Sequence, residues 1–162
     1  MTWEDWRQGI PDIYYANSSN GGVTFTGDVA VNDNLGDGSN QKFPAIDVGN
    51  DRRIHVAWYD ERLGGGGDIF YANSSTSGSS FATNIRVNND PVGLYKQELP
   101  AIAVGNNYQV HVVWMDTRTD TNYDIYYTHF HDNPIPEFSA LIIPVVAVVA
   151  LFVAYSRIRR KK

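Results

Sequence analysis

A tryptophan, an aspartate and an arginine recur three times in this chain with the spacing W-x-D-x-R. The first copy begins at Trp3, and the other two consist of Trp58, Asp60, Arg62, Trp114, Asp116 and Arg118. A carboxylate and a guanidinium two residues apart could bind a sugar or a carboxylate ligand through charge-assisted hydrogen bonds. A catalytic centre between repeated units needs different residues from different units, whereas these copies are alike. We therefore interpret the Asp–Arg pairs as structural ion pairs and assign no catalytic residue.

A long tandem repeat positions these motifs. Residues 12–19 (DIYYANSS) recur as residues 68–75 (DIFYANSS), and the triplet PAI at residue 44 recurs at residue 100 with the same offset. A fixed period is typical of arrays in which each unit is one supersecondary structure that packs against its neighbours. The repeat predicts propeller blades over residues 1–130, in units at about 3–57, 58–113 and, as a partial third copy, 114–130.

Four short runs rich in β-branched and aromatic residues occur within one period, bounded by Gly, Asn, Asp and Ser clusters, at residues 12–17, 24–31, 43–48 and 54–60. Four strands per unit predict a β-propeller blade. The expected fold is all-β, a partial β-propeller of about two and a half four-stranded blades followed by one C-terminal transmembrane helix. An immunoglobulin-like sandwich is the alternative, but it needs about 100 residues per unit and would not explain three equal motifs.

Two turns of the repeat resemble the Asp-box, S-x-D-x-G-x-T-[WF]. Their matching positions are Ser18, Asn20, Gly22, Thr24 and Phe25 in one copy, and Ser74, Thr76, Gly78 and Phe81 in the other. On these residues the chain resembles the sialidase-like (BNR repeat) β-propellers, although Asn20 and Thr76 stand where the family has an acid. The resemblance implies a structural turn remote from the active site. The turn chemistry agrees, because a short polar side chain can bind backbone amides and glycine can adopt positive φ.

Counting strands from these turns assigns the loops to two faces, because antiparallel strands send successive loops to opposite ends. The Asp-box face is predicted to hold loops 18–24, 49–53, 74–80 and 105–109. The opposite face, where related propellers bind ligands, is predicted to hold loops 32–42, 60–67, 88–98 and 116–123.

Three hypotheses for function follow. The leading one is a non-catalytic surface module that binds a glycan or protein ligand or builds the cell envelope. The alternative is the C-terminal fragment of an exo-sialidase or related glycoside hydrolase with its catalytic blades upstream. The resemblance implies an arginine triad, a Tyr/Glu nucleophile pair and an acid Asp for such an enzyme, and two and a half blades cannot present the whole set. A third hypothesis is a homo-oligomer, in which blades of several chains close a ring.

The C-terminal end changes character at Phe138. Residues 138–155 carry no charge, and at about 1.5 Å per residue they span roughly 27 Å, enough to cross the hydrocarbon core of a membrane. Five cations within residues 156–162 predict a cytoplasmic C-terminus and a cell-surface location for everything before Phe138. After a linker at 131–137, the residues Pro136, Glu137 and Phe138 resemble a PEF-type archaeal sorting signal. That resemblance implies processing by an archaeosortase, and an ordinary single-pass anchor is the alternative.

Charge and cysteine content exclude several classes of function. Residues 1–137 hold eight cations against eighteen acids, a formal charge of −10, and such a surface repels nucleic acid and anionic lipid. The absence of cysteine excludes disulfides, thiolate metal sites and cysteine nucleophiles. Residues 1–6 do not resemble a signal peptide, and the simplest expectation is that the natural chain begins further upstream.

The sequence contains three weaker candidates for metal-binding or modification sites. The loop from Asn32 to Gly38 has oxygen atoms that could hold calcium, but its spacing does not match an EF-hand, so we favour a solvated turn and expect no metal or cofactor. His55 and His111 are expected on strands, whereas His129 and His131 lie near the linker, where a metal pair is the less favoured reading. Asn17 and Asn73 begin glycosylation sequons, and these predict glycosylation of both residues outside the cell. The alternative is that the two sequons match only because the surrounding sequence is repeated.

Overall fold

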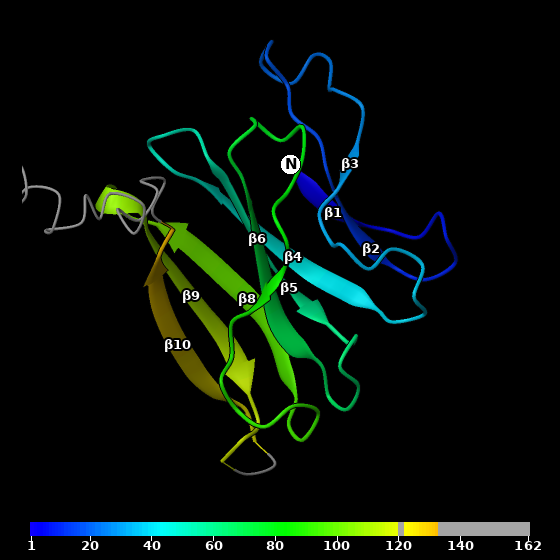
Figure 1. The fold of residues 1–162 in the computed structure, drawn as a ribbon, viewed down its shortest axis with the longest axis vertical. Helices are drawn as coiled ribbons and strands as arrows, with labels where there is room; N and C mark the ends of the chain where they lie inside the picture. Colours follow the sequence, from blue (N-terminus) through cyan, green and yellow to red (C-terminus); the bar gives the residue numbers. More distant parts are fainter. Residues whose placement is uncertain (120–121, 133–162) are drawn as a thin grey trace, which may run out of the picture. The chain divides into compact units, whose positions relative to one another are not determined.

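The computed structural model describes residues 1–119 and 122–132, and these form three antiparallel sheets (Figure 1). The first sheet contains β1 (Thr2–Asp5), β2 (Asp12–Tyr15) and β3 (Val29–Ala30). The second contains β4 (Gln41–Val48), β5 (Ile54–Asp60), β6 (Asp68–Ser74) and β7 (Ile85–Arg86). The third contains β8 (Gln97–Val104), β9 (Gln109–Asp116) and β10 (Asp124–His131), with a 3-10 turn, η1 (Asn106–Tyr108), between β8 and β9. The described residues contain no α-helix, so the expectation of an all-β fold is confirmed for them.

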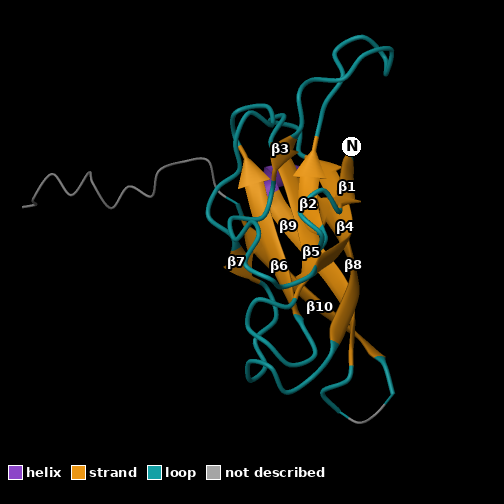
Figure 2. Ribbon diagram, turned by 90° about the vertical axis from the view of Figure 1, so that its right-hand side faces the viewer, coloured by secondary structure: helices purple, strands orange, loops and turns teal. Residues whose placement is uncertain are grey.

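Within each sheet, every strand pairs with the strand that follows it in the chain. Figure 2 shows that the loops consequently gather at the two ends of the strands. Strands β4 and β8 carry a β-bulge at the same place, where Phe43 and Leu99 adopt φ of 53° and 50°. Each bulge directly precedes a proline, Pro44 or Pro100, which has no backbone N–H to donate to a ladder.

An asparagine side chain takes over from the backbone at the C-terminal ends of strands β3 and β7. Asn32 Oδ1 accepts a hydrogen bond from the backbone N–H of Ile13 at 2.8 Å, and Asn88 Oδ1 accepts the equivalent one from Ile69 at 2.8 Å. The run at 24–31, expected to be a full strand, has ladder pairs only at Val29–Ala30.

The sheets are out of phase with the sequence units. The second sheet has four strands, but they run from residue 41 to residue 86 and so extend across the predicted boundary at 57/58. The four runs that were expected to form one blade instead contribute β2 and β3 to the first sheet and β4 and β5 to the second. That grouping was wrong because a tandem repeat can be divided at any phase, and β5 pairs with β6 across a short loop at 61–67.

Two hydrophobic clusters lie between neighbouring sheets. The first joins the first and second sheets and consists of Ile13, Tyr15, Val31, Ile54, Val56, Trp58, Phe70 and Ala72. The second joins the second and third sheets and consists of Ala57, Ile69, Tyr71, Val110, Val112 and Trp114. Both interfaces pack an Ile-x-Tyr pair on one sheet against a Val-x-Trp pair on the next, so the sequence repeat is also a repeat of packing.

The two outer faces of the array expose the residues that these interfaces bury. Ile125, the third-sheet equivalent of Ile13 and Ile69, is 73% exposed, whereas Ile13 and Ile69 are completely buried. Tyr127, the equivalent of Tyr15 and Tyr71, is also exposed. On the outer face of the first sheet, a cavity of about 480 Å³ is lined by residues that include Met1, Trp3 and Phe25.

The predicted linker, the predicted transmembrane segment and the basic tail lie almost wholly outside the described residues. Strand β10 extends through His131, the first residue of the predicted linker. The sorting residues Pro136, Glu137 and Phe138, the segment 138–155 and the tail 156–162 fall outside the described part. Within the part described, no helix is long and apolar enough to span a membrane.

Candidate functional site

The W-x-D-x-R residues form the same hydrogen-bonded cluster in every sheet. In the second sheet, Trp58 Nε1 and Arg62 Nη2 each donate to Asp60 Oδ2 at 2.8 Å, and the Arg62 backbone N–H donates to Oδ1 at 2.9 Å. In the third sheet, the equivalent three bonds to Asp116 measure 2.9, 2.6 and 2.8 Å. Asp60 and Asp116 are both fully buried. Both oxygens of each carboxylate accept hydrogen bonds from the tryptophan and arginine of the same motif.

The arginine of each motif also lies over an aromatic ring of the next strand. The guanidinium carbon is 4.3 Å from the ring centroid for Arg7, 4.4 Å for Arg62 and 4.1 Å for Arg118. The rings belong to Tyr14, Phe70 and Tyr126, and the tryptophan of the same motif packs near each of them. A guanidinium held between a carboxylate and an aromatic face is fixed in position by both charge and stacking.

Two of the arginines connect neighbouring sheets. Arg62 Nη1 donates to Asp33 Oδ1 at 2.5 Å, and Arg118 Nη1 donates to Asn89 Oδ1 at 3.0 Å. Asp33 and Asn89 occupy equivalent positions in the loops that lead from one sheet into the next. The motif therefore joins its own sheet to the preceding inter-sheet loop, as a structural element would. Arg7 of the first copy pairs with Asp28 of the same sheet.

The protonation states of the third motif agree with a permanent ion pair. Burial alone would raise the pKa of Asp116, but the hydrogen bonds from Arg118 and Trp114 lower its pKa below the usual value. Burial acts to lower the pKa of Arg118, and Asp116 more than offsets this, so that pKa is raised. Neither group changes its charge near neutral pH, and neither is suited to proton transfer.

The two Asp-box-like turns are closed by equivalent hydrogen bonds. Ser18 Oγ accepts from the Gly22 backbone N–H at 2.8 Å, and Ser74 Oγ accepts from Gly78 at 2.9 Å. The position that is acidic in the family, Asn20 or Thr76, accepts from the backbone N–H four residues later at 3.0 Å in both copies. An amide or hydroxyl oxygen can therefore make this bond in place of a carboxylate.

The phenylalanines after these turns differ in their surroundings. Phe81 packs edge-on against Tyr15 with ring centroids 5.5 Å apart, at the interface of the first two sheets. Phe25 is half exposed, because its side of the first sheet has no neighbouring sheet in the described residues. The expectation that both rings anchor a turn between sheets holds for Phe81 only.

A groove of about 780 Å³ lies on the face opposite the Asp-box-like turns, between the loops before β8 and after β9. It is lined by Leu94, Tyr95, Lys96, Thr117, Arg118, Thr119 and Tyr123. Lys96 Nζ pairs with Glu98 at 2.7 Å, and Tyr123 donates its hydroxyl to the same carboxylate at 2.7 Å. The Glu98 contact raises the pKa of Lys96. The groove thus combines exposed apolar and aromatic surface with hydroxyl groups, and both of its cations are paired.

Most of the groove is specific to the third sheet. The equivalent positions one repeat earlier, in the order of the lining residues, are Gly38, Ser39, Asn40, Glu61, Arg62, Leu63 and Gly67. Only the arginine is shared between the two sets. Tyr95 and Tyr123 have no aromatic counterpart in the earlier copy. The arginine, which joins neighbouring sheets, is kept in both copies of the repeat. The other groove residues differ in type from their counterparts in the earlier copy.

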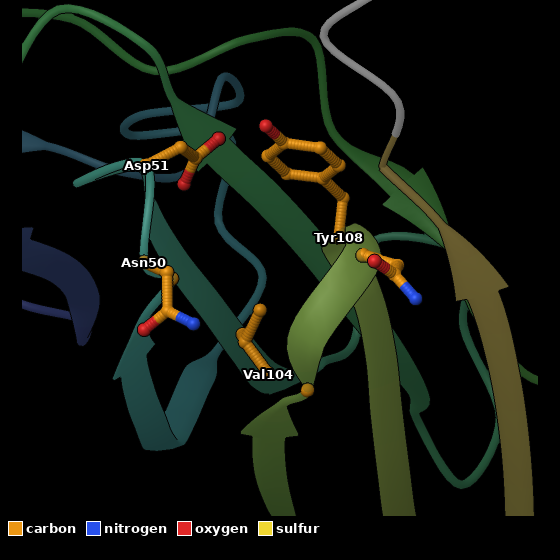
Figure 3. A pocket seen from close by; sticks show the side chains of 7 residues that line it. Asn50, Asp51, Val104 and Tyr108 are labelled. Carbon is orange, nitrogen blue, oxygen red and sulfur yellow. The ribbon is translucent and has the colours of Figure 1, made fainter.

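A second hollow lies on the Asp-box face, between the β4–β5 turn and η1. Figure 3 shows Asn50 and Asp51 on one side and Val104 and Tyr108 on the other. The backbone here is unusual, since Asn107 and Tyr108 both have φ above 60°. Its volume is about 210 Å³, below the roughly 300–1,000 Å³ of ordinary ligand sites. The groove on the opposite face falls within that range and is the better candidate.

The histidines and sequons lie on the strands or at their ends. His55 and His111, on β5 and β9, each place Nδ1 near a tyrosine hydroxyl, at 2.7 and 2.8 Å. His129 and His131 belong to β10. Within residues 1–119 and 122–132, no group of three or more His, Cys, Asp or Glu side chains could hold a metal ion. The sequon residues Asn17 and Asn73 are both partly buried.

Two buried polar networks were not identified from the sequence. Asn32 Nδ2 donates to Asp12 Oδ1 at 2.8 Å, and Asn88 Nδ2 donates to Asp68 Oδ1 at 2.7 Å. All four side chains are buried beside a sheet junction. The available signal was the recurrence of an Asp and an Asn with the same separation in both copies of the repeat.

Comparison with known proteins adds no relative: no protein-family model matches the chain, and no curated protein matches it.

Proposed function

We propose that this chain is a surface-anchored β-propeller repeat module, related to the sialidase-like propellers, that binds a glycan without hydrolysing it. The observation that carries the proposal is the groove lined by residues 94–96, 117–119 and 123, whose side chains, apart from Arg118, are specific to the third sheet. It lies on the face where related propellers bind ligands. The same non-catalytic hypothesis also allows a protein as the ligand in place of a glycan.

The chemistry of the groove favours a neutral sugar. Tyr95 and Tyr123 offer aromatic faces for sugar C–H groups, and Thr117 and Thr119 offer hydroxyls for hydrogen bonds. Lys96 is paired with Glu98, and Arg118 is paired with Asp116. An acidic sugar would have to compete with these carboxylates, so the groove suits an uncharged oligosaccharide better than a sialic acid.

The enzyme hypothesis keeps one supporting observation, which is that the groove residues differ between copies, as those of a catalytic centre would. Against it, Asp60 is engaged by three donors of its own motif and Asp116 by four. Those groups are not available as acid, base or nucleophile. The non-catalytic role is therefore the better supported one.

Replacing Tyr123 with alanine is expected to weaken binding of neutral oligosaccharides. The loss of one stacking face is worth about 1 kcal/mol, which is roughly a fivefold increase in Kd. Titration calorimetry of the full chain against neutral and sialylated oligosaccharides measures this. Tyr123→Phe keeps the ring and is the matched control, expected to bind within about twofold of the parent chain. Preferred binding of sialylated sugars, or their hydrolysis, would contradict the proposal.

The surface location is proposed from the sequence of the C-terminal segment. The uncharged residues 138–155, followed by a basic tail, suit a single-pass anchor with the C-terminus in the cytoplasm. Pro136, Glu137 and Phe138 suit removal of the tail by an archaeosortase. The full chain, expressed in cells, is expected to stay in the membrane pellet after alkaline carbonate extraction. Its release into the supernatant would contradict an anchor of this kind.

The outer faces of the array support self-association with a second copy of the chain. The exposed Ile125 and Tyr127 correspond to residues that the neighbouring sheet buries in both earlier copies. The outer face of the first sheet offers a cavity of about 480 Å³ with Trp3 and Phe25 in its lining. A head-to-tail contact between these two different faces can repeat from chain to chain and close into a ring.

A further inference from the structure

The second buried network contains an arginine that neutralises its carboxylates. Arg86 Nε donates to Asp68 Oδ1 at 2.6 Å, and Arg86 Nη2 donates to the Asp90 carbonyl oxygen at 2.6 Å. Asn88 Nδ2 donates to both acids, at 2.7 Å each. Arg118 adds a second guanidinium, 3.3 Å from Asp90 Oδ1.

The first buried network repeats this arrangement without the arginine. Asn32 Nδ2 donates to Asp12 Oδ1 at 2.8 Å and to Asn34 Oδ1 at 3.1 Å, in the same places as the Asn88 bonds. Ala30 stands where Arg86 stands, because Ala30 pairs with Tyr14 and Arg86 pairs with the equivalent Phe70. The first network thus keeps the carboxylate and amide acceptors at these positions but has an alanine in place of the arginine.

This difference leaves the first network short of positive charge. Its acids are Asp12, Asp33, Asp37 and Asp60, and its guanidinium is Arg62. The second network has three acids, Asp68, Asp90 and Asp116, and two guanidiniums, Arg86 and Arg118.

Asp12 is the acid most affected by the missing charge. Its side chain is 1% exposed, and its Oδ2 atom has no hydrogen-bond partner among the described residues. Asp68 Oδ2 is also without a partner there, but Asp68 has Arg86 beside its other oxygen. An uncompensated carboxylate at this depth is costly unless a cation or a proton joins it.

We propose that a calcium ion takes the place of the missing guanidinium, held by the Asp12 and Asp37 carboxylates together with the oxygens of Asn34. Calcium prefers carboxylate, amide and backbone carbonyl oxygens and accepts irregular geometry. Asn34 connects the two acids, since its Nδ2 donates to Asp37 Oδ2 at 2.7 Å while its Oδ1 shares the Asn32 amide with Asp12. Asp37 has no counterpart in the second network, where Gly93 stands at that position.

Calorimetric titration of the full, EDTA-treated chain with calcium chloride tests this proposal, with magnesium chloride and sodium chloride at matched ionic strength as references. We expect one calcium site per chain, with a Kd of roughly 0.1–1 mM, the range of extracellular calcium modules. The thermal midpoint should rise with calcium and not with the reference salts. Equal effects of all three salts, or no binding of calcium, would overturn the proposal.

The repeat supplies matched variants. Ala30→Arg introduces the guanidinium into the first network and should abolish calcium binding, whereas Arg86→Ala, in a network with Gly93 in place of Asp37, should leave the number of calcium sites unchanged. Asp12→Asn is the second test if Ala30→Arg fails to fold, and it should also bind no calcium. Calcium binding that is unchanged in a folded Ala30→Arg or Asp12→Asn chain would refute the site.

Discussion

Asp60→Ala is expected to lower the free energy of unfolding by about 3–5 kcal/mol, the usual cost of removing one partner of a buried ion pair. The side chain is fully buried and accepts from Trp58, Arg62 and the Arg62 backbone. Its removal leaves the Trp58 indole N–H without its acceptor and takes from the Arg62 guanidinium the buried one of its two carboxylates, leaving Asp33. Urea denaturation of the full chain, followed by tryptophan fluorescence, measures the change.

Asp5→Ala is the matched control, because it removes the same carboxylate from the first copy of the motif. The Arg7 side chain paired with Asp5 is 48% exposed, so water can solvate it after the change. The expected cost is about 1 kcal/mol or less. Equal losses in the two variants would contradict the idea that burial between sheets gives the motif its structural role.

Ile125→Asp is expected to abolish self-association of the chain. The residue lies on the exposed third-sheet face, and a carboxylate there would have to be buried without a partner in the proposed contact. Light scattering after size exclusion should show an oligomer for the parent chain and a monomer for the variant. Phe25→Asp, on the opposite outer face, should give the same result, because a head-to-tail contact uses both faces.

Val23→Asp is the control for this experiment. Val23 is 81% exposed in an Asp-box-like turn and does not line the hollow that contains Phe25, so the oligomer should persist. A parent chain that is monomeric at every concentration tested would contradict self-association. Disruption by Ile125→Asp but not by Phe25→Asp would indicate a symmetric contact between two third sheets instead of a head-to-tail array.

The sequence predicted strands best where side chains alternate and the backbone pairs on both sides. Residues 54–60 were expected as a strand and form β5 with those bounds. The run 24–31 was less predictable, because a side-chain oxygen of Asn32 ends the regular pairing at Ala30. The grouping of strands into sheets was not encoded in the period, since a tandem repeat of fixed length is equally consistent with any starting point.

The candidate sites also differ in how far the sequence alone could predict them. Repeated residues such as Asp60 and Arg62 were recognisable, because identical spacing in three copies pointed to a shared structural role. The groove was not, because Tyr95 and Tyr123 come from two different loops, one before β8 and one after β9, and are brought together only by the pairing of these strands. The consequence of Ala30 was hidden too, because it depends on a register between β2 and β3 that only the structure supplies.

The meander order of the strands has a consequence for how the chain folds during synthesis. Every strand finds its partner in the segment made just before or just after it, so few contacts wait for distant parts of the chain. Each completed sheet presents its Ile-x-Tyr face as a template for the next, and the Arg62 contact with Asp33 forms only once the second sheet arrives. Folding can therefore proceed from the N-terminus sheet by sheet at the pace of translation, and each new sheet covers the Ile-x-Tyr face of the sheet before it.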